Sequence, residues 1–194
     1  VQTCALPIFC DLLTEKDKVY EAVLLLGKET DTQDLTGKVL AEKPVTAEKD
    51  EVERAIRSFE GAYDQIPPMY SALKVQGQKL CDLARKGIEV ERKPRRVYIY
   101  KVEILQVDIP RVVMRVYCSK GTYIRTLCHD IGKKLGCGGC MASLKRTEVA
   151  AFLEKDALTL AQIQEKKEAG ALEEILYPVD FVFLALEKGT VKKK

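Results

Sequence analysis

Alternation of apolar and polar residues predicts a β-hairpin near the middle of the chain. Residues 97–107 and 112–119 both alternate, and the intervening Asp108-Ile109-Pro110 has the composition of a turn. Residues 18–26 alternate weakly and then become continuously apolar, which indicates a partly buried strand. Further strand character is found in residues 39–41 and 141–152.

Helical spacing of apolar residues predicts two longer helices. Apolar residues recur every three or four positions from Val52 to Phe59, and Thr46 upstream is a suitable N-cap. Residues 122–135 have the same spacing and are followed by Gly136, the residue type that commonly ends a helix. Shorter helices are predicted at residues 80–86, 160–169 and 171–176. This mixture of strands and helices indicates an α+β fold.

Two segments are predicted to lack regular structure. Residues 27–37 are polar and rich in turn-forming residues. Residues 61–70 contain Pro67-Pro68, which favours an extended loop because proline restricts the residue before it to extended backbone.

The composition is that of an ordinary soluble globular protein. The chain has 194 residues, 46% of them hydrophobic and 31% charged, and can therefore bury a core. Its longest aliphatic run is residues 22–26, far short of the roughly 18 apolar residues of a membrane helix, so no membrane partner is expected. Seven cysteines spread through regular segments indicate reduced thiols and a cytoplasmic location.

The net charge of +3 conceals a local basic patch. Between Arg85 and Lys101 only Glu89 and Glu91 are acidic, and the basic residues are Arg85, Lys86, Arg92, Lys93, Arg95, Arg96 and Lys101. A patch of this kind commonly contacts phosphate.

Three segments carry polar groups that a packed strand or helix does not require: residues 18–20, 120–126 and 144–147. The second joins a strand to a helix through a glycine, and the free amides at a helix start favour an anion. Taken singly, each segment is well explained by tyrosines at strand ends and solvated arginines. Together with the basic patch and with Tyr70, Tyr98 and Tyr100, they predict a nucleic-acid-processing site that combines aromatic stacking with phosphate contacts.

The cysteines allow a different hypothesis. Cys137 and Cys140 have the CxxC spacing, and Cys128 and His129 lie close upstream, so the four could nominally bind zinc. Zinc sites usually pair two separated CxxC units, whereas this chain has one and a single histidine. A glycine-rich turn with incidental thiols is the favoured interpretation.

Several of these stretches resemble the bacterial tRNA pseudouridine synthase B family. The matching segments are residues 13–20, 27–34, 66–74, 84–87, 119–127, 135–138 and 144–147. The resemblance covers about Cys10 to Phe183, and it implies a mixed-sheet pseudouridine synthase catalytic domain with an RNA-clasping insertion at residues 66–96. It also implies isomerisation of the T-loop uridine at tRNA position 55, with the tRNA T-arm as partner, base flipping, a monomer, and neither cofactor nor metal.

The resemblance also assigns residues. Tyr20 resembles the tyrosine that stacks on the flipped uracil, and Lys18 belongs to the same motif. Tyr123 resembles a second pocket aromatic, Leu144 the apolar wall, and Arg125 the arginine that pairs with the catalytic aspartate. The residues expected to bind RNA are Tyr70, Lys74, Arg85, Lys86, Arg92, Lys93, Arg95 and Arg96.

One family element is missing from the sequence. The nucleophilic aspartate of the family lies in a Gly-Thr-Leu-Asp-Pro loop, and no Asp-Pro dipeptide occurs in these 194 residues. We therefore expect a domain truncated at both ends: residues 1–9 non-native and similar to a translated sequencing adapter, residues 10–183 a partial catalytic domain, and residues 184–194 a tail. An inactive enzyme fragment and a tRNA-binding module without catalysis are the two hypotheses. Both expect Arg125 to lack its carboxylate partner.

Overall fold

The computed structural model describes residues 15–150, 152–178, 181 and 183. Residues 19–145 form one compact unit, and the described residues of the two terminal parts form a second. Residues 1–9 and 184–194, predicted to be a non-native segment and a tail, lie outside the described residues.

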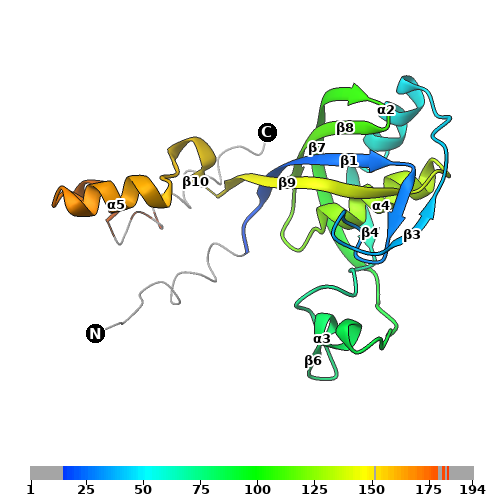
Figure 1. The fold of residues 1–194 in the computed structure, drawn as a ribbon, viewed down its shortest axis with the longest axis horizontal. Helices are drawn as coiled ribbons and strands as arrows, with labels where there is room; N and C mark the ends of the chain where they lie inside the picture. The colour runs from blue at the N-terminus through cyan, green and yellow to red at the C-terminus, as the bar shows by residue number, and fades with distance from the viewer. Residues whose placement is uncertain (1–14, 151, 179–180, 182, 184–194) are drawn as a thin grey trace. The chain divides into compact units, whose positions relative to one another are not determined.

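A six-stranded sheet with the order β10-β9-β1-β8-β7-β4 forms the framework of the fold (Figure 1). Its strands are β1 (Lys18–Leu26), β4 (Gly61–Gln65), β7 (Arg95–Asp108), β8 (Arg111–Cys118), β9 (Gly139–Val149) and β10 (Phe152–Leu153). The predicted hairpin is confirmed, because β7 and β8 pair antiparallel with Ile104 opposite Met114. The α+β class is confirmed as well.

Helices α2 (Lys49–Arg57) and α4 (Ile124–Lys134) cover one face of this sheet (Figure 1). Their buried side chains join alternate residues of the central strands in one core cluster that includes Leu24, Ile56, Met114, Leu127 and Ile131. Both helices were predicted from the spacing of their apolar residues. Burial of the apolar face of α4 packs this helix against the sheet.

Two segments predicted as loops contain strands. β2 (Lys28–Thr30) lies in the polar segment 27–37 and pairs with β3 (Val39–Glu42). β4 occupies the first half of the segment expected to be an extended loop and pairs along its whole length with β7. Both strands are stabilised by pairing with residues outside their own segments, which the local composition does not record.

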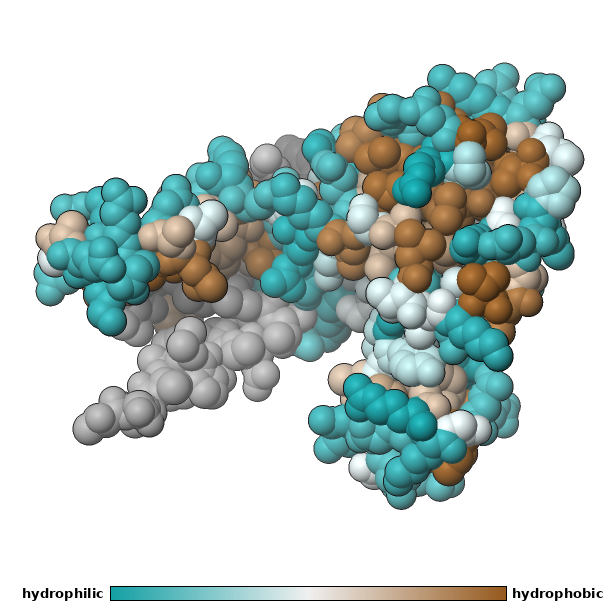
Figure 2. All heavy atoms as spheres, in the orientation of Figure 1, coloured by the Kyte–Doolittle hydropathy of each residue, from teal (hydrophilic) through white to brown (hydrophobic). Residues whose placement is uncertain are grey.

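Residues 66–94 lie between β4 and β7, and we call them the insertion. They contain β5 (Lys74–Val75), β6 (Gln78–Lys79) and helix α3 (Leu80–Arg85). Met69, Leu80 and Leu83 form a small core of their own, separate from the main one. On the face visible in Figure 2 the insertion is mostly hydrophilic.

The second unit carries 3₁₀ helix η1 (Glu154–Asp156), helix α5 (Leu160–Glu168) and 3₁₀ helix η2 (Leu172–Ile175). Thr159 and Gln162 form a capping box that begins α5. Among the described residues, no helix has the length and apolar character needed to cross a membrane.

Candidate functional site

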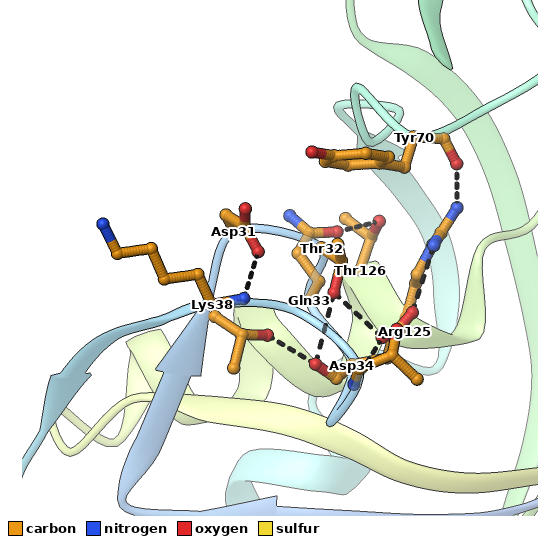
Figure 3. Close-up of polar contacts among 10 residues, drawn as sticks. Asp31, Thr32, Gln33, Asp34, Lys38, Tyr70, Arg125 and Thr126 are labelled. Atoms are coloured by element: carbon orange, nitrogen blue, oxygen red, sulfur yellow. Dashed lines mark hydrogen bonds and ion pairs between the residues drawn. The ribbon is translucent and has the colours of Figure 1, made fainter. Parts of the chain in front are cut away.

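Arg125, in the first turn of α4, is the centre of a hydrogen-bonded group (Figure 3). Its Nη1 lies 3.2 Å from Oδ2 of Asp34, and its Nη2 donates to the main-chain oxygen of Tyr70. The Arg125 and Asp34 side chains are only 20% and 17% exposed. The expectation that Arg125 lacks a carboxylate partner is therefore wrong: the loop after β2 supplies Asp34.

Asp34 is itself held by the loop that carries it. Its Oδ1 accepts hydrogen bonds from Thr32 Oγ1 at 2.9 Å, Thr36 Oγ1 at 2.5 Å and Thr36 N at 3.0 Å. Burial raises the pKa of the Asp34 carboxyl, but the hydrogen bonds from Thr36, Thr32 and Arg125 outweigh burial and leave this pKa below its ordinary value. Asp34 is consequently ionised at neutral pH and can balance the Arg125 charge.

The same loop is fixed to two neighbouring elements. Gln33 accepts a hydrogen bond from Thr126 Oγ1 of α4 at 2.7 Å through its side chain, and its main-chain oxygen accepts from Met141 N of β9 at 3.0 Å. Leu35 N donates back to the Met141 oxygen at 3.1 Å. Gln33 adopts a φ of 65°, an uncommon conformation for a residue with a side chain. The carboxylate is thus presented to Arg125 by a loop anchored on both sides.

Tyr123 precedes α4 as its N-cap, and its backbone is held by Gln65 of β4. Tyr123 N donates to Gln65 Oε1 at 2.8 Å, and Gln65 Nε2 donates to the Tyr123 oxygen at 3.0 Å. The Gln65 residue is 1% exposed. Sequence reasoning missed Gln65 and Asp34. Both lie in stretches that resemble the family or adjoin one, but neither stretch shows which partner its side chain contacts.

The three remaining pocket candidates lie on strands rather than in the group around Arg125. Tyr20 of β1 is half-buried and packs against the main core. Leu144 of β9 is 44% exposed, which is consistent with an apolar wall open to a ligand. Lys18 donates to the main-chain oxygen of Lys16 at 2.5 Å.

The basic residues predicted to bind RNA fall into two groups. Three arginines already have carboxylate partners: Arg85 with Asp82, Arg92 with Glu89 and Arg96 with Asp64. Four residues are exposed without an ion pair among the described residues: Lys74, Lys86, Lys93 and Arg95. The second group is the better candidate for contacts with RNA phosphates, because no carboxylate among the described residues neutralises its charges.

Arg92 and Tyr70 also have structural contacts in the insertion. Arg92 is only 21% exposed, and its Nη1 donates to the main-chain oxygen of Pro67 at 3.2 Å. Tyr70 packs against the insertion core and turns its carbonyl toward Arg125 (Figure 3). On β7, the exposed Tyr98 and Tyr100 rings stack with centroids 6.4 Å apart.

The cysteines do not support the zinc hypothesis. Cys128, Cys137 and Cys140 are buried free thiols, and burial raises the pKa of Cys128 well above its ordinary value. His129 faces Glu29, with Nδ1 3.7 Å from Oε1. Within the described part of the chain, no three His, Cys, Asp or Glu side chains are grouped so that they could hold a metal ion.

The fold matches those of solved complexes that contain Cbf5. A Cbf5-Nop10-Gar1 complex aligns with a TM-score of 0.67 and 26% identity, covering 90% of this chain and 45% of that one. An archaeal box H/ACA sRNP Nop10-Cbf5 complex aligns with a TM-score of 0.61 and 25% identity, covering 91% and 44%. The architecture is that of a pseudouridine synthase.

Sequence comparison narrows this class to one family. Residues 8–124 match the N-terminal domain of TruB family pseudouridylate synthases, and residues 125–183 match the tRNA pseudouridylate synthase B C-terminal domain. The chain belongs to the TruB family of pseudouridylate synthases.

Two curated relatives are named tRNA pseudouridine synthase B. The protein of Lachnoclostridium phytofermentans is 55% identical over 193 residues, covering 95% of this chain and 63% of that protein. The protein of Alkaliphilus oremlandii is 47% identical over 180 residues, covering 93% and 59%. The chain therefore spans about three fifths of the length of these relatives.

Proposed function

We propose that these residues are the substrate-binding part of an enzyme that converts the T-loop uridine of tRNA, at position 55, to pseudouridine. The observation that carries the proposal is the Arg125–Asp34 pair at the start of α4, held between the loop after β2 and the insertion. Family membership adds the reaction: a C–N glycosidic bond is exchanged for a C–C bond, with no net redox change or hydrolysis. The reaction itself requires neither a cofactor nor a metal ion.

In this proposal the target nucleotide leaves the T-arm stack, because its glycosidic bond is inaccessible within the folded arm. Tyr20 stacks on the flipped base, Tyr123 is the second aromatic, and Leu144 forms an apolar wall. Arg125 takes the place of the family arginine that pairs with the catalytic carboxylate, and here Asp34 holds its guanidinium in position. Its preset geometry comes from Asp34 and the Tyr70 carbonyl, so little reorganisation accompanies binding.

The nucleophile is the part of the reaction that the printed residues do not supply, because they contain no Asp-Pro dipeptide. The 194-residue chain as it stands is therefore expected to bind tRNA without isomerising it. The exposed basic residues Lys74, Lys86, Lys93 and Arg95 support a second candidate function, a tRNA-binding module without catalysis.

A chimera separates the two candidates. Joining the N-terminal part of the Lachnoclostridium phytofermentans relative to Cys10 is expected to give a protein that forms pseudouridine in tRNA, detected by mass spectrometry of nucleosides. A second chimera with asparagine in place of the supplied aspartate controls for contaminating host enzyme. Activity of the 194-residue chain alone contradicts the assignment of the nucleophile. A folded chimera that binds tRNA and forms no product supports the binding module.

Neutralising the unpaired basic residues is expected to weaken RNA binding and its dependence on salt. In the double variant Lys93→Gln/Arg95→Gln, each lost phosphate contact lowers the slope of log K against log [salt] by about 1. Titrations of a T-arm hairpin at several salt concentrations measure this slope. Arg96→Gln is the matched control, because Asp64 already holds that guanidinium, with N–O distances of 2.7 and 2.6 Å. An unchanged slope in the double variant rules out the phosphate role of these two residues.

A further inference from the structure

Two side chains of β4 reach the same helix, α4, at different points. Gln65 bonds to both main-chain polar groups of Tyr123, immediately before the helix. Tyr63, two residues earlier on the same strand, donates from its hydroxyl to Oδ2 of Asp130, about two helical turns further along. β4 therefore holds α4 at its start through Gln65 and farther along its length through Tyr63.

The Gln65 contact supplies, from outside the helix, one of the two hydrogen bonds of a capping box. The first amides of a helix lack partners within the helix, and Tyr123 as N-cap has no side-chain hydrogen bond of its own to supply one. Gln65 Oε1 instead accepts from the Tyr123 N–H, as the side chain of a capping box would do from within the helix. Because Gln65 is buried at 1% exposure, water has little access to replace either of its hydrogen bonds.

Gln65 also occupies the root of the insertion. It is the last residue of β4, and it pairs with Arg95, the first residue of β7, so that these two residues close the base of residues 66–94. On the pocket side, the insertion contacts Arg125 through the carbonyl of Tyr70. Two residues at the start of α4 are thus fixed near the insertion: Tyr123 by Gln65 at its root, and Arg125 by the carbonyl of Tyr70 within it.

We propose that Gln65 is a positioning residue that fixes Tyr123 in the base pocket relative to the root of the RNA-binding insertion. When the insertion binds RNA, the Tyr123 ring is then already in position to contact the flipped base. The inference rests on the proposed function for the meaning of the pocket. Its structural content, the fixing of Tyr123 by Gln65, can be measured without RNA.

The competing interpretation is that Gln65 only stabilises the fold, as many buried amides do. Tyr63→Phe is the control that separates the two, because the Tyr63 hydroxyl lies beside Gln65 and joins β4 to α4 through Asp130, and its removal leaves both Gln65–Tyr123 hydrogen bonds in place. Both Tyr63→Phe and Gln65→Met remove a contact between the same strand and the same helix. Only Gln65→Met removes hydrogen bonds from the Tyr123 backbone: the Tyr123 N–H loses its Gln65 acceptor, and the Tyr123 oxygen keeps only Leu127 N, at 3.1 Å.

The first measurement uses the 194-residue chain without RNA. Fluorotyrosine incorporated at Tyr123 is followed by fluorine NMR in the wild type, Gln65→Met and Tyr63→Phe. We expect one sharp resonance in the wild type and in Tyr63→Phe, and a shifted or broadened resonance in Gln65→Met. If Gln65→Met fails to fold, Gln65→Glu replaces it, since this variant keeps an acceptor for Tyr123 N–H and loses the donor. An unchanged Tyr123 resonance in the folded Gln65 variant overturns the inference.

The second measurement compares two T-arm hairpins, one with the target uridine and one with an abasic nucleotide at that position. Stacking of one base on an aromatic pocket corresponds to about a tenfold preference for the uridine hairpin. We expect Tyr63→Phe to keep this ratio and Gln65→Met to reduce it to about twofold or less, with unchanged affinity for the abasic hairpin. An undiminished ratio in Gln65→Met also overturns the inference. A wild-type ratio of one contradicts the proposed function instead, and the fluorine measurement still decides the role of Gln65.

Discussion

Gly132→Ala is expected to destabilise the unit of residues 19–145 strongly. Gly132 lies within α4, where alanine is ordinarily favoured over glycine by about 1 kcal/mol. Here an added Cβ would lie 2.2 Å from the nitrogen of Gly139 and 2.3 Å from the carbonyl carbon of Gly138. These are backbone atoms at the start of β9 and cannot move aside as a flexible side chain would. The expected loss in the free energy of unfolding is about 4 kcal/mol or more, measured by urea denaturation of the 194-residue chain.

Gly136→Ala is the matched control for this prediction. Gly136 follows α4 with a φ of 76°, and no heavy atom lies within 4 Å of its added Cβ. Its cost is therefore limited to the backbone conformation, about 1 kcal/mol. If Gly132→Ala proves no more destabilising than Gly136→Ala, the close approach of α4 to β9 described here is wrong.

The second large effect is expected from Asp34→Asn. This variant keeps the size of the side chain but leaves Arg125 without a negative charge, and the pair is mostly buried at 17% and 20% exposure. Removing one partner of such a pair costs about 3 kcal/mol, because the remaining charge stays desolvated. Asp64→Asn is the control: its pair with Arg96 is 53% and 62% exposed, and we expect its unfolding curve to be nearly unchanged. Equal effects of the two variants would contradict the buried pair.

The contribution of Asp34 should also depend on pH in a defined direction. The folded-state pKa of Asp34 lies below its ordinary value, so its ionised form contributes stability that is fully present above about pH 3.9. As pH falls through the folded-state pKa, the carboxyl is protonated and this stability is lost. The difference in unfolding free energy between wild type and Asp34→Asn should therefore be largest at neutral pH and shrink toward pH 3. A difference that grows on acidification would contradict the assignment.

Much of the fold could be predicted because its periodic segments carry their own signal. The β7–β8 hairpin alternates strictly enough to be recognised, and α4 shows its buried face in the spacing of Ile124, Leu127 and Ile131. β2 and β4 could not be predicted in the same way. Their residues are largely polar or small, and they become strands only because β3 and β7 offer pairing partners.

In the site, individual residues could likewise be predicted from the sequence, but the residues they contact could not. Tyr123 and Arg125 could be singled out from the motif at the helix start. Their partners could not, because Asp34 lies 91 positions from Arg125 and Gln65 lies 58 positions from Tyr123. The charge count likewise assigned Arg92 to RNA, whereas the structure shows its guanidinium bonded to the Pro67 carbonyl and to Glu89. A count of charges does not reveal which of them are already neutralised.

The most direct test of the central claim is the affinity ratio of the wild-type chain for the uridine and abasic T-arm hairpins. The claim is that these residues form a pocket for a flipped uridine at the start of α4, beside an insertion that binds the RNA backbone. It predicts salt-dependent binding of both hairpins and about a tenfold preference for the one that carries the base. Equal affinity for the two hairpins would show that the chain recognises only the RNA backbone, and would contradict the claim.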